Sequence, residues 1–199
     1  MPDFYLSGIS KGEYSEKGSL FSARAYPANT LDEVKAELTH LKENFPESSH
    51  YCYAYRIYHA SRLDEFSTDA GEPKGSAGLP ILNVLKRHEL VNICIFVLRF
   101  YGGSKLGIPG LINAYGAAAE DAVTGGKKLP WIKTEKVTLH FNYVLQGKVE
   151  AVLKKFKAEI ITSGFGESIK LQVEVNNQSK CGMLNSLREI SNGKIEICN

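Results

Sequence analysis

Side chains that could do chemistry are concentrated in two glycine-rich segments, residues 69–78 and 99–107. Each segment mixes charged or hydroxyl side chains with glycines and leads into a predicted helix. Helix N-termini carry free backbone N–H groups and a partial positive charge, so they attract anions. We therefore expect the two segments to face each other across one anion-binding cleft. Its candidate residues are Asp69, Glu72, Lys74, Gly75, Ser76, Arg99, Gly102, Gly103, Ser104, Lys105 and Gly107.

These residue types allow three kinds of chemistry. Cations such as Lys74, Arg99 and Lys105 beside exposed N–H groups suit phosphate, whether of a nucleic-acid backbone or of a small ligand. Alternatively, Arg99 and Lys105 hold Asp69 and Glu72 and so fasten the two segments together. Two carboxylates three residues apart also suit acid–base catalysis, although Asp often only caps a turn. Binding fits the pattern better than catalysis, and we assign no catalytic residue.

Several other kinds of site lack their sequence signature. GGSKLG does not match the phosphate-binding P-loop, and Ser104 is not part of a G-x-S-x-G nucleophile elbow. The histidines do not follow H-x-x-x-H spacing or lie near cysteines at ligand spacing, so we expect no metal and no cofactor. The cysteines Cys52, Cys94, Cys181 and Cys198 are scattered, which predicts reduced thiols in a cytosolic protein.

A helix, a strand and a second helix position the two segments. Pro80 suits the first turn of a helix, and Pro109 suits the start of the next. Between them, residues 93–98 are uninterruptedly apolar, which is typical of a strand covered on both faces. Each glycine-rich segment therefore leads into a helix, and we expect both helices to pack on the same sheet.

Upstream of the site we expect two strands, at residues 4–14 and 19–26, and a helix opened by the capping box at Thr30. Residues 50–59 alternate as a strand with tyrosines on one face. Those tyrosines could stack on bases, but a core face is the favoured interpretation. Residues 60–78 are interpreted as a long polar loop, which favours a functional role.

The downstream part has a strand, helix, strand, strand, helix, strand order typical of a ferredoxin-like domain. Its expected strands lie at residues 135–143, 158–163, 168–175 and 194–198. Residues 127–133 contain Pro130 and Trp131 and resemble a linker. We therefore divide the chain into domains at 1–126 and 134–199, with the linker 127–133 between them.

Two long motifs resemble the IMPACT/YigZ family. They read DAGEPKGSAG followed by PILNVL, and RFYGGSKLG followed by GLINAYGAAAEDA. The usual pattern of the family is roughly DDGEPSGTAG, followed by a strand ending R-Y-[FY]-GG, then KLG and GLV-x-AYG. Ala70 stands where the family usually has a second Asp, which weakens any argument for a carboxylate pair. Pro109 stands where it usually has Gly, which suggests a stiffer helix start.

The resemblance implies an α+β fold of two domains. The N-terminal domain would be a two-layer α/β domain similar to a small-subunit ribosomal protein and to domain IV of elongation factor EF-G. The C-terminal domain would be ferredoxin-like and similar to EF-G domain V. The resemblance further implies a connection with translation, as in the bacterial two-domain members of the family. Fold alone does not give function.

Composition sets wide limits on function. The chain has 199 residues, 43% of them hydrophobic and 23% charged, as in an ordinary soluble globular protein. A net charge of +2 neither indicates a nucleic-acid binder nor excludes a local basic patch. No apolar run reaches the roughly 18 residues of a membrane span, and the N-terminus lacks the features of a signal peptide. We expect a cytoplasmic protein with no membrane partner.

The main functional hypothesis is a non-enzymatic translation regulator or accessory factor. It would bind RNA or the ribosome, or a protein partner in the translation apparatus, through the cationic cleft of the N-terminal domain. One alternative is an enzyme that acts on a phosphorylated small molecule in the same cleft. Another is a protein-interaction module that uses the exposed sheet face of the ferredoxin-like domain.

Overall fold

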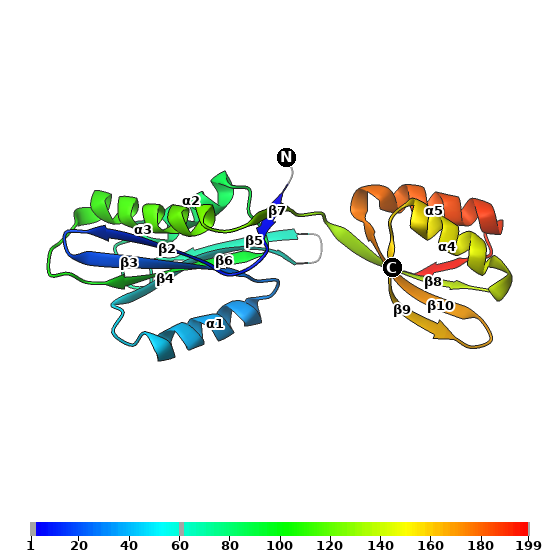
Figure 1. Cartoon of the computed structure of the whole chain (residues 1–199), viewed down its shortest axis with the longest axis horizontal. Helices are drawn as coiled ribbons and strands as arrows, with labels where there is room; N and C mark the ends of the chain where they lie inside the picture. The colour runs from blue at the N-terminus through cyan, green and yellow to red at the C-terminus, as the bar shows by residue number, and fades with distance from the viewer. Residues whose placement is uncertain (1–2, 60–61, 199) are drawn as a thin grey trace. The chain divides into compact units, whose positions relative to one another are not determined.

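The computed structural model describes residues 3–59 and 62–198. The chain divides into two compact units, Met1–Trp131 and Ile132–Asn199 (Figure 1). Each unit has a hydrophobic core of its own. The α+β class with two domains is therefore as predicted.

The N-terminal unit is built on a five-stranded antiparallel sheet with strand order β2-β3-β6-β4-β5. A separate pair joins β1 to β7, also antiparallel. The strands are β1 Phe4–Leu6, β2 Ser10–Glu16, β3 Ser19–Pro27, β4 His50–His59, β5 Arg62–Thr68, β6 Ile93–Phe100 and β7 Lys128–Pro130.

Helices cover both faces of this sheet. α1 (Leu31–Asn44) lies on one face, and α2 (Gly78–Arg87) and α3 (Gly107–Thr124) lie on the other (Figure 1). Along β6, Ile95 and Val97 belong to the core under α2 and α3, whereas Phe96 and Leu98 belong to the core under α1. The apolar run of β6 is therefore covered on both faces, as predicted. The unit has one more helical layer than the two-layer arrangement we expected.

The tyrosine face of β4 belongs to the core on the α1 side. Tyr53 and Tyr55 pack against that core, and both rings contact Phe66 at centroid distances of 5.8 and 5.4 Å. The Tyr51 hydroxyl donates a hydrogen bond to the Phe45 carbonyl at 2.5 Å. The core interpretation of these tyrosines is confirmed.

The prediction of a long loop at residues 60–78 is wrong for residues 62–68. Arg62–Thr68 form β5, which pairs with β4 from His59↔Arg62 to Tyr53↔Thr68; residues 60 and 61 lie outside the described residues. The composition of this strand is polar, but pairing with β4 satisfies its backbone groups. Strand propensity depends on such context more than on composition. The true loop runs from Asp69 to Ala77.

The C-terminal unit has the ferredoxin-like order predicted for it. Its elements are β8 Thr134–Phe141, the 3-10 turn η1 Tyr143–Leu145, α4 Gln146–Lys155, β9 Glu159–Phe165, β10 Ile169–Asn176, α5 Asn177–Ser191 and β11 Glu196–Cys198. The sheet order is β11-β8-β10-β9, with all neighbours antiparallel. One core includes Leu139, Val149 and Met183, so the helices cover one face of the sheet.

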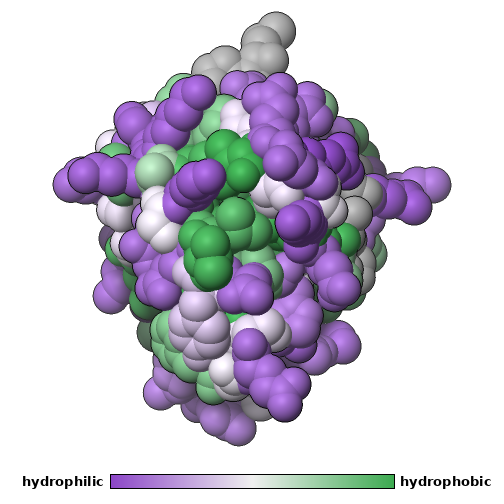
Figure 2. Space-filling model, turned by 90° about the vertical axis from the view of Figure 1, so that its right-hand side faces the viewer, coloured by the Kyte–Doolittle hydropathy of each residue, from purple (hydrophilic) through white to green (hydrophobic). Residues whose placement is uncertain are grey.

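Some large apolar side chains of the C-terminal unit remain exposed. Val144 is 85% exposed and Phe165 65% exposed. The face in Figure 2 shows a small area of apolar side chains (green) bordered by hydrophilic ones (purple).

The segment expected as a linker is partly structured. Residues 128–130 form β7, and the Trp131 ring stacks on Tyr58 at 4.4 Å between centroids. The Trp131 backbone N–H also donates to the Asp3 carbonyl at 2.8 Å. These contacts attach the segment through Trp131 to the N-terminal unit, so the exposed junction begins at Ile132, whose side chain is 57% exposed.

We expect the two units to fold independently. Brief thermolysin digestion, which cuts before aliphatic residues, should cleave between Trp131 and Ile132, because Ile132 is 57% exposed. It should release two fragments that each unfold cooperatively on heating, because each has its own core. Gel analysis with mass spectrometry would locate the cut, and calorimetry would follow unfolding. Early cleavage inside either unit, or fragments without a transition, would contradict independent folding.

Candidate anion-binding site

Asp69 organises the first loop of the site. Its carboxylate accepts hydrogen bonds from the backbone N–H groups of Gly75 at 2.8 Å, Ala77 at 3.0 Å and Gly78 at 2.9 Å. Since Gly78 is the first residue of α2, Asp69 caps this helix from across the loop. Burial by itself raises the pKa of the Asp69 carboxyl, but the three N–H donors outweigh burial and bring it below its ordinary value. Asp69 therefore holds the loop together as an ionised cap.

Two glycines allow backbone segments to approach closely. A Cβ on Gly78 would lie 2.6 Å from the Thr68 nitrogen, where α2 begins against the end of β5. A Cβ on Gly102 would lie 1.9 Å from the Gly18 carbonyl carbon, where the second loop meets the turn between β2 and β3. Both glycines are thus required by backbone packing rather than by a ligand.

Ala70 has a left-handed backbone conformation, with φ of 46°. This conformation is unfavourable for alanine, whereas Gly and, to a lesser degree, Asp and Asn tolerate it. An aspartate at this position, as the family pattern has it, would suit the backbone better. The alanine that replaces the usual family aspartate at position 70 therefore strains the backbone of the first loop.

A buried ion pair connects the two loops. The Arg99 Nη1 atom donates to Glu72 Oε1 at 2.7 Å, and the Tyr115 hydroxyl of α3 donates to the same oxygen at 2.8 Å. The side chains of Arg99 and Glu72 are only 8% and 3% exposed. Burial, followed by the neighbouring Cys52 and Glu72, raises the pKa of Tyr115 far above its ordinary value, so its hydroxyl stays a donor. Arg99 thus holds Glu72, as one of the sequence hypotheses proposed.

Arg99 keeps unused donors. Within residues 3–59 and 62–198, its side chain makes one hydrogen bond, to Glu72, and the buried Nε atom has no partner. The rings of Phe21 and Tyr101 lie 5.5 and 5.3 Å from the guanidinium carbon. A guanidinium has five N–H donors, so most of the hydrogen-bonding capacity of Arg99 is unused.

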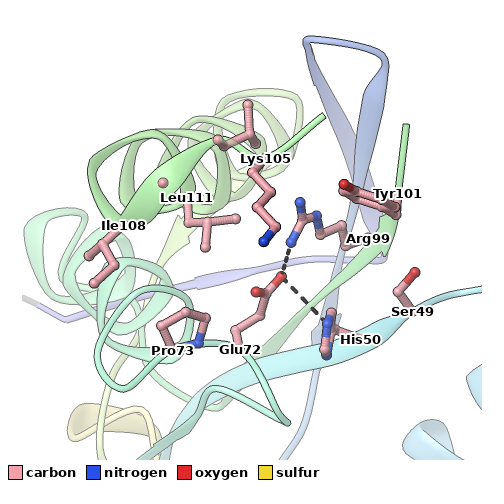
Figure 3. A pocket seen from close by; sticks show the side chains of 11 residues that line it. Ser49, His50, Glu72, Pro73, Arg99, Tyr101, Lys105, Ile108 and Leu111 are labelled. Carbon is pink, nitrogen blue, oxygen red and sulfur yellow. Dashed lines mark hydrogen bonds and ion pairs between the residues drawn. The ribbon is translucent and has the colours of Figure 1, made fainter. Parts of the chain in front are cut away.

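A cavity of about 480 Å³ lies beside the Arg99–Glu72 pair. In Figure 3 the Lys105 side chain points toward Glu72 and Arg99. Lys105 has no ion-pair or hydrogen-bond partner in the part of the chain that the structure describes. Because Glu72 offsets Arg99, Lys105 leaves one uncompensated positive charge. The lining residues are Ser49, His50, Glu72, Pro73, Arg99, Tyr101, Lys105, Leu106, Gly107, Ile108 and Leu111.

The two loops face each other across this cavity. Glu72 comes from the first loop, and Lys105 and Gly107 come from the second. Arg99 lies near the end of β6, between them. The other predicted residues do not line the cavity. Asp69, Gly75 and Ser76 build the first loop, where the Ser76 hydroxyl donates to the Pro73 carbonyl at 2.7 Å; Lys74, Gly102, Gly103 and Ser104 lie outside the lining.

Sequence reasoning missed His50 and the apolar lining residues. His50 lies opposite Arg99 in the pairing of β4 with β6. Its Nδ1 atom is 3.0 Å from the Ala70 carbonyl, so Nδ1 carries a proton, and its Nε2 atom lies 3.9 Å from Glu72 Oε1. The sequence carried no signal for His50, because the register that places it opposite Arg99 joins residues far apart along the chain. The apolar lining residues carried no sequence signal, because apolar spacing assigns such residues to the core.

The described residues hold no group of three or more His, Cys, Asp or Glu side chains placed to bind a metal. No helix in the described ranges is long and apolar enough to cross a membrane. Cys52 and Cys94 are buried, whereas Cys181 and Cys198 are exposed, and all four are free thiols.

Residues 17–123 match the Impact N-terminal domain, and residues 139–194 match a domain of unknown function, DUF1949. The chain belongs to the IMPACT family. An IMPACT family member from Thermus thermophilus is 31% identical over 178 residues, which cover 89% of this chain and 96% of that relative. The IMPACT family member YigZ of Escherichia coli is 27% identical, over 91% of this chain and 89% of YigZ.

A solved crystal structure of a hypothetical protein shares the fold. It aligns with 99% of this chain and 97% of its own, with a TM-score of 0.73 and 24% identity. This likeness supports the two-domain IMPACT fold over nearly the whole chain. At this identity it carries no conclusion about activity.

The cap made by Asp69 should stabilise the fold in a pH-dependent way. Asp69→Asn should lower the free energy of unfolding at pH 7 by about 1–3 kcal/mol, because one charge-assisted acceptor is lost. The folded-state pKa of Asp69 is lowered, so its stabilisation is present above the unfolded pKa and is lost as the pH falls below about 4. Urea denaturation at several pH values would measure this. The control is Glu47→Gln, at an exposed carboxylate without an ion pair or hydrogen bond among the described residues. A difference that does not shrink as the pH falls below about 4 would contradict the role.

The strained backbone at Ala70 should be relieved by glycine. Ala70→Gly should raise the free energy of unfolding by about 0.5–1 kcal/mol, since the left-handed conformation costs alanine more than glycine loses in unfolded-state entropy. The control is Ala36→Gly, in the middle of α1, which should lower it by about 1 kcal/mol. Denaturation curves of both variants would show opposite signs; a loss of stability in both would argue against strain at Ala70.

Proposed function

We propose that this protein is a translation regulator or accessory factor that engages RNA or the ribosome by binding an anionic group in the cavity of its N-terminal unit. Two arguments support the proposal. The chain belongs to the IMPACT family. Membership of this family implies a connection with translation. The cavity also has the donors that recognition of an oxyanion needs.

The observation that carries the proposal is the state of Arg99. This residue is 7% exposed, and its side chain makes one hydrogen bond within the described chain. Its Nε atom is buried, whereas Nη2 has no partner in the described chain and keeps solvent-accessible surface. An anion in the cavity can accept a hydrogen bond from Nη2 and also meet Lys105. Charge-assisted bonds to an oxyanion are the stronger class of hydrogen bond, so they favour binding.

A second candidate is an enzyme that acts on a phosphorylated small molecule in the same cavity. The volume of about 480 Å³ lies within the range of roughly 300–1,000 Å³ of small-molecule sites. In a neutral His50 ring, the Nδ1 proton directed to the Ala70 carbonyl would leave a lone pair on Nε2, beside the cavity. A base in this position could accept a proton. Turnover of phosphate esters that is lost in His50→Gln would support this candidate.

The third candidate, a protein-interaction module, is supported by the exposed apolar side chains of the C-terminal unit. Ile160, Ile161 and Phe165 of β9 are 49%, 40% and 65% exposed. β9 is also an edge strand of its sheet. Edge strands with apolar side chains can pair with another chain. Loss of a partner on changing β9 alone would favour this candidate over the cavity.

Lys105 should be required for association with the translation apparatus. Lys105→Ala should weaken cosedimentation with ribosomes about tenfold, because one uncompensated charge leaves the cavity. Its melting temperature should not change, since Lys105 is exposed and makes no bond within the described residues. If the bound group is a phosphate, the slope of log affinity against log salt should also fall by about one.

Lys74→Ala is the matched control, because Lys74 is an exposed loop cation that does not line the cavity. It should sediment with ribosomes as the unchanged protein does. Equal effects of the two substitutions would mean that only overall charge matters. An undiminished association of Lys105→Ala would reject the cavity as the binding site.

A further inference from the structure

We infer that the anionic group bound in the cavity is a single carboxylate next to an apolar side chain, presented by a protein partner. This inference rests on the proposed function, because it assumes that the cavity takes an anion. It goes further in naming the partner as a protein segment with an acidic residue beside an apolar one. The charge, the walls and the size of the cavity each support it.

The charge of the cavity suits a monoanion. Arg99 is paired with Glu72 at 2.7 Å, so Lys105 is the uncompensated cation of the described lining. Binding along a nucleic-acid backbone requires a cation for each phosphate contacted, and its strength grows with their number. A site with one net positive charge is poorly suited to that task. One carboxylate matches it.

The donors also suit a carboxylate. The guanidinium is a planar fork that binds carboxylate oxygens in two-pronged geometry. Arg99 uses Nη1 for Glu72 and retains its other donors beside the cavity, while Lys105 points to the same place (Figure 3). A carboxylate that enters here can accept from Arg99 with one oxygen and from Lys105 with the other.

The walls of the cavity are largely apolar. Pro73, Leu106 and Leu111 line it, and Ile108 and Tyr101 at its opening are 53% and 50% exposed. Contact with such walls does not lower the free energy of a phosphate group. An aliphatic or aromatic side chain is stabilised there, because its apolar surface leaves water. The preferred occupant therefore has both an anionic and an apolar part.

The size of the apolar surface favours a protein over a free small acid. A cavity of about 480 Å³ holds a carboxylate side chain and an apolar neighbour together. Beyond it, Ile112 lies one helical turn from Ile108 on α3 and is 44% exposed. A small acid would leave this apolar surface in water, but a protein segment can cover it. Tyr and Arg are enriched in protein interfaces, and Tyr101 and Arg99 both line this cavity.

The test uses the full chain and the side-chain Nε–H signal of Arg99 in ¹⁵N NMR. The probes are the peptide N-acetyl-Leu-Glu-Phe-amide, its glutamine twin N-acetyl-Leu-Gln-Phe-amide, 4-methylpentanoate, inorganic phosphate and a short oligouridylate. The glutamate peptide should shift the Arg99 signal saturably, and the glutamine twin should bind at least tenfold more weakly. A shift by oligouridylate or phosphate, with none by the peptide, would overturn the inference. So would 4-methylpentanoate binding as tightly as the peptide, because a free acid would then suffice.

A paired variant tests the apolar part. Ile108→Ser should weaken binding of the glutamate peptide about fivefold, whereas Ile9→Ser should leave it unchanged, because Ile9 is 62% exposed and does not line the cavity. Equal affinity for both variants would count against the apolar contact.

Ribosome sedimentation of the Lys105 variant separates the two proposals. If ribosome association depends on Lys105 and the peptide does not bind, the carboxylate inference fails while the proposed function stands. If the peptide shifts the Arg99 signal but Lys105→Ala leaves ribosome association unchanged, the proposed function fails. The inference that the cavity binds a carboxylate then stands.

Discussion

The buried ion pair between Arg99 and Glu72 is the interaction on which the N-terminal site depends. It joins the end of β6 to the first loop, and through the Tyr115 hydroxyl it also joins α3. Burying two charges is costly, and the cost is recovered only when their hydrogen bonds are well placed. Here one carboxylate oxygen of Glu72 accepts two hydrogen bonds. Removing one partner would leave the other charge buried and unpaired, at a cost on the order of 3–5 kcal/mol.

This pair also explains why the site offers less charge than its composition suggests. Asp69 is used to cap α2, and Glu72 is used to hold Arg99. Ser76 is fully buried and bonded to the Pro73 carbonyl. What remains for a ligand is Lys105 and the unused donors of Arg99. The hypothesis that cations hold the two carboxylates is therefore confirmed for Glu72 and wrong for Asp69, which backbone N–H groups hold. The binding hypothesis stays a prediction.

Two glycine contacts set the positions of these loops. Gly78 lets α2 start against the backbone of Thr68, and Gly102 lets the second loop lie against the backbone of Gly18. Any larger residue would separate these backbones. Since one loop carries Glu72 and the other carries Lys105, the shape of the cavity depends on both contacts.

The sequence by itself determined the elements and the family. Apolar spacing located β6, α2 and α3, the motifs around Glu72 and Arg99 identified the IMPACT family, and the order of elements identified the ferredoxin-like domain. These features depend on neighbours along the chain, so local spacing reveals them. Only the tertiary structure decided that Arg62–Thr68 form a strand, that His50 lies beside Arg99, and that Ile108 and Leu111 line the cavity. Strand pairing and register join residues far apart in sequence, and a polar or apolar pattern does not encode which distant backbone satisfies a given strand. The sequence offered Asp69 as a turn cap, but the three N–H groups that it accepts from, and the uncompensated charge of Lys105, were decided by the tertiary structure.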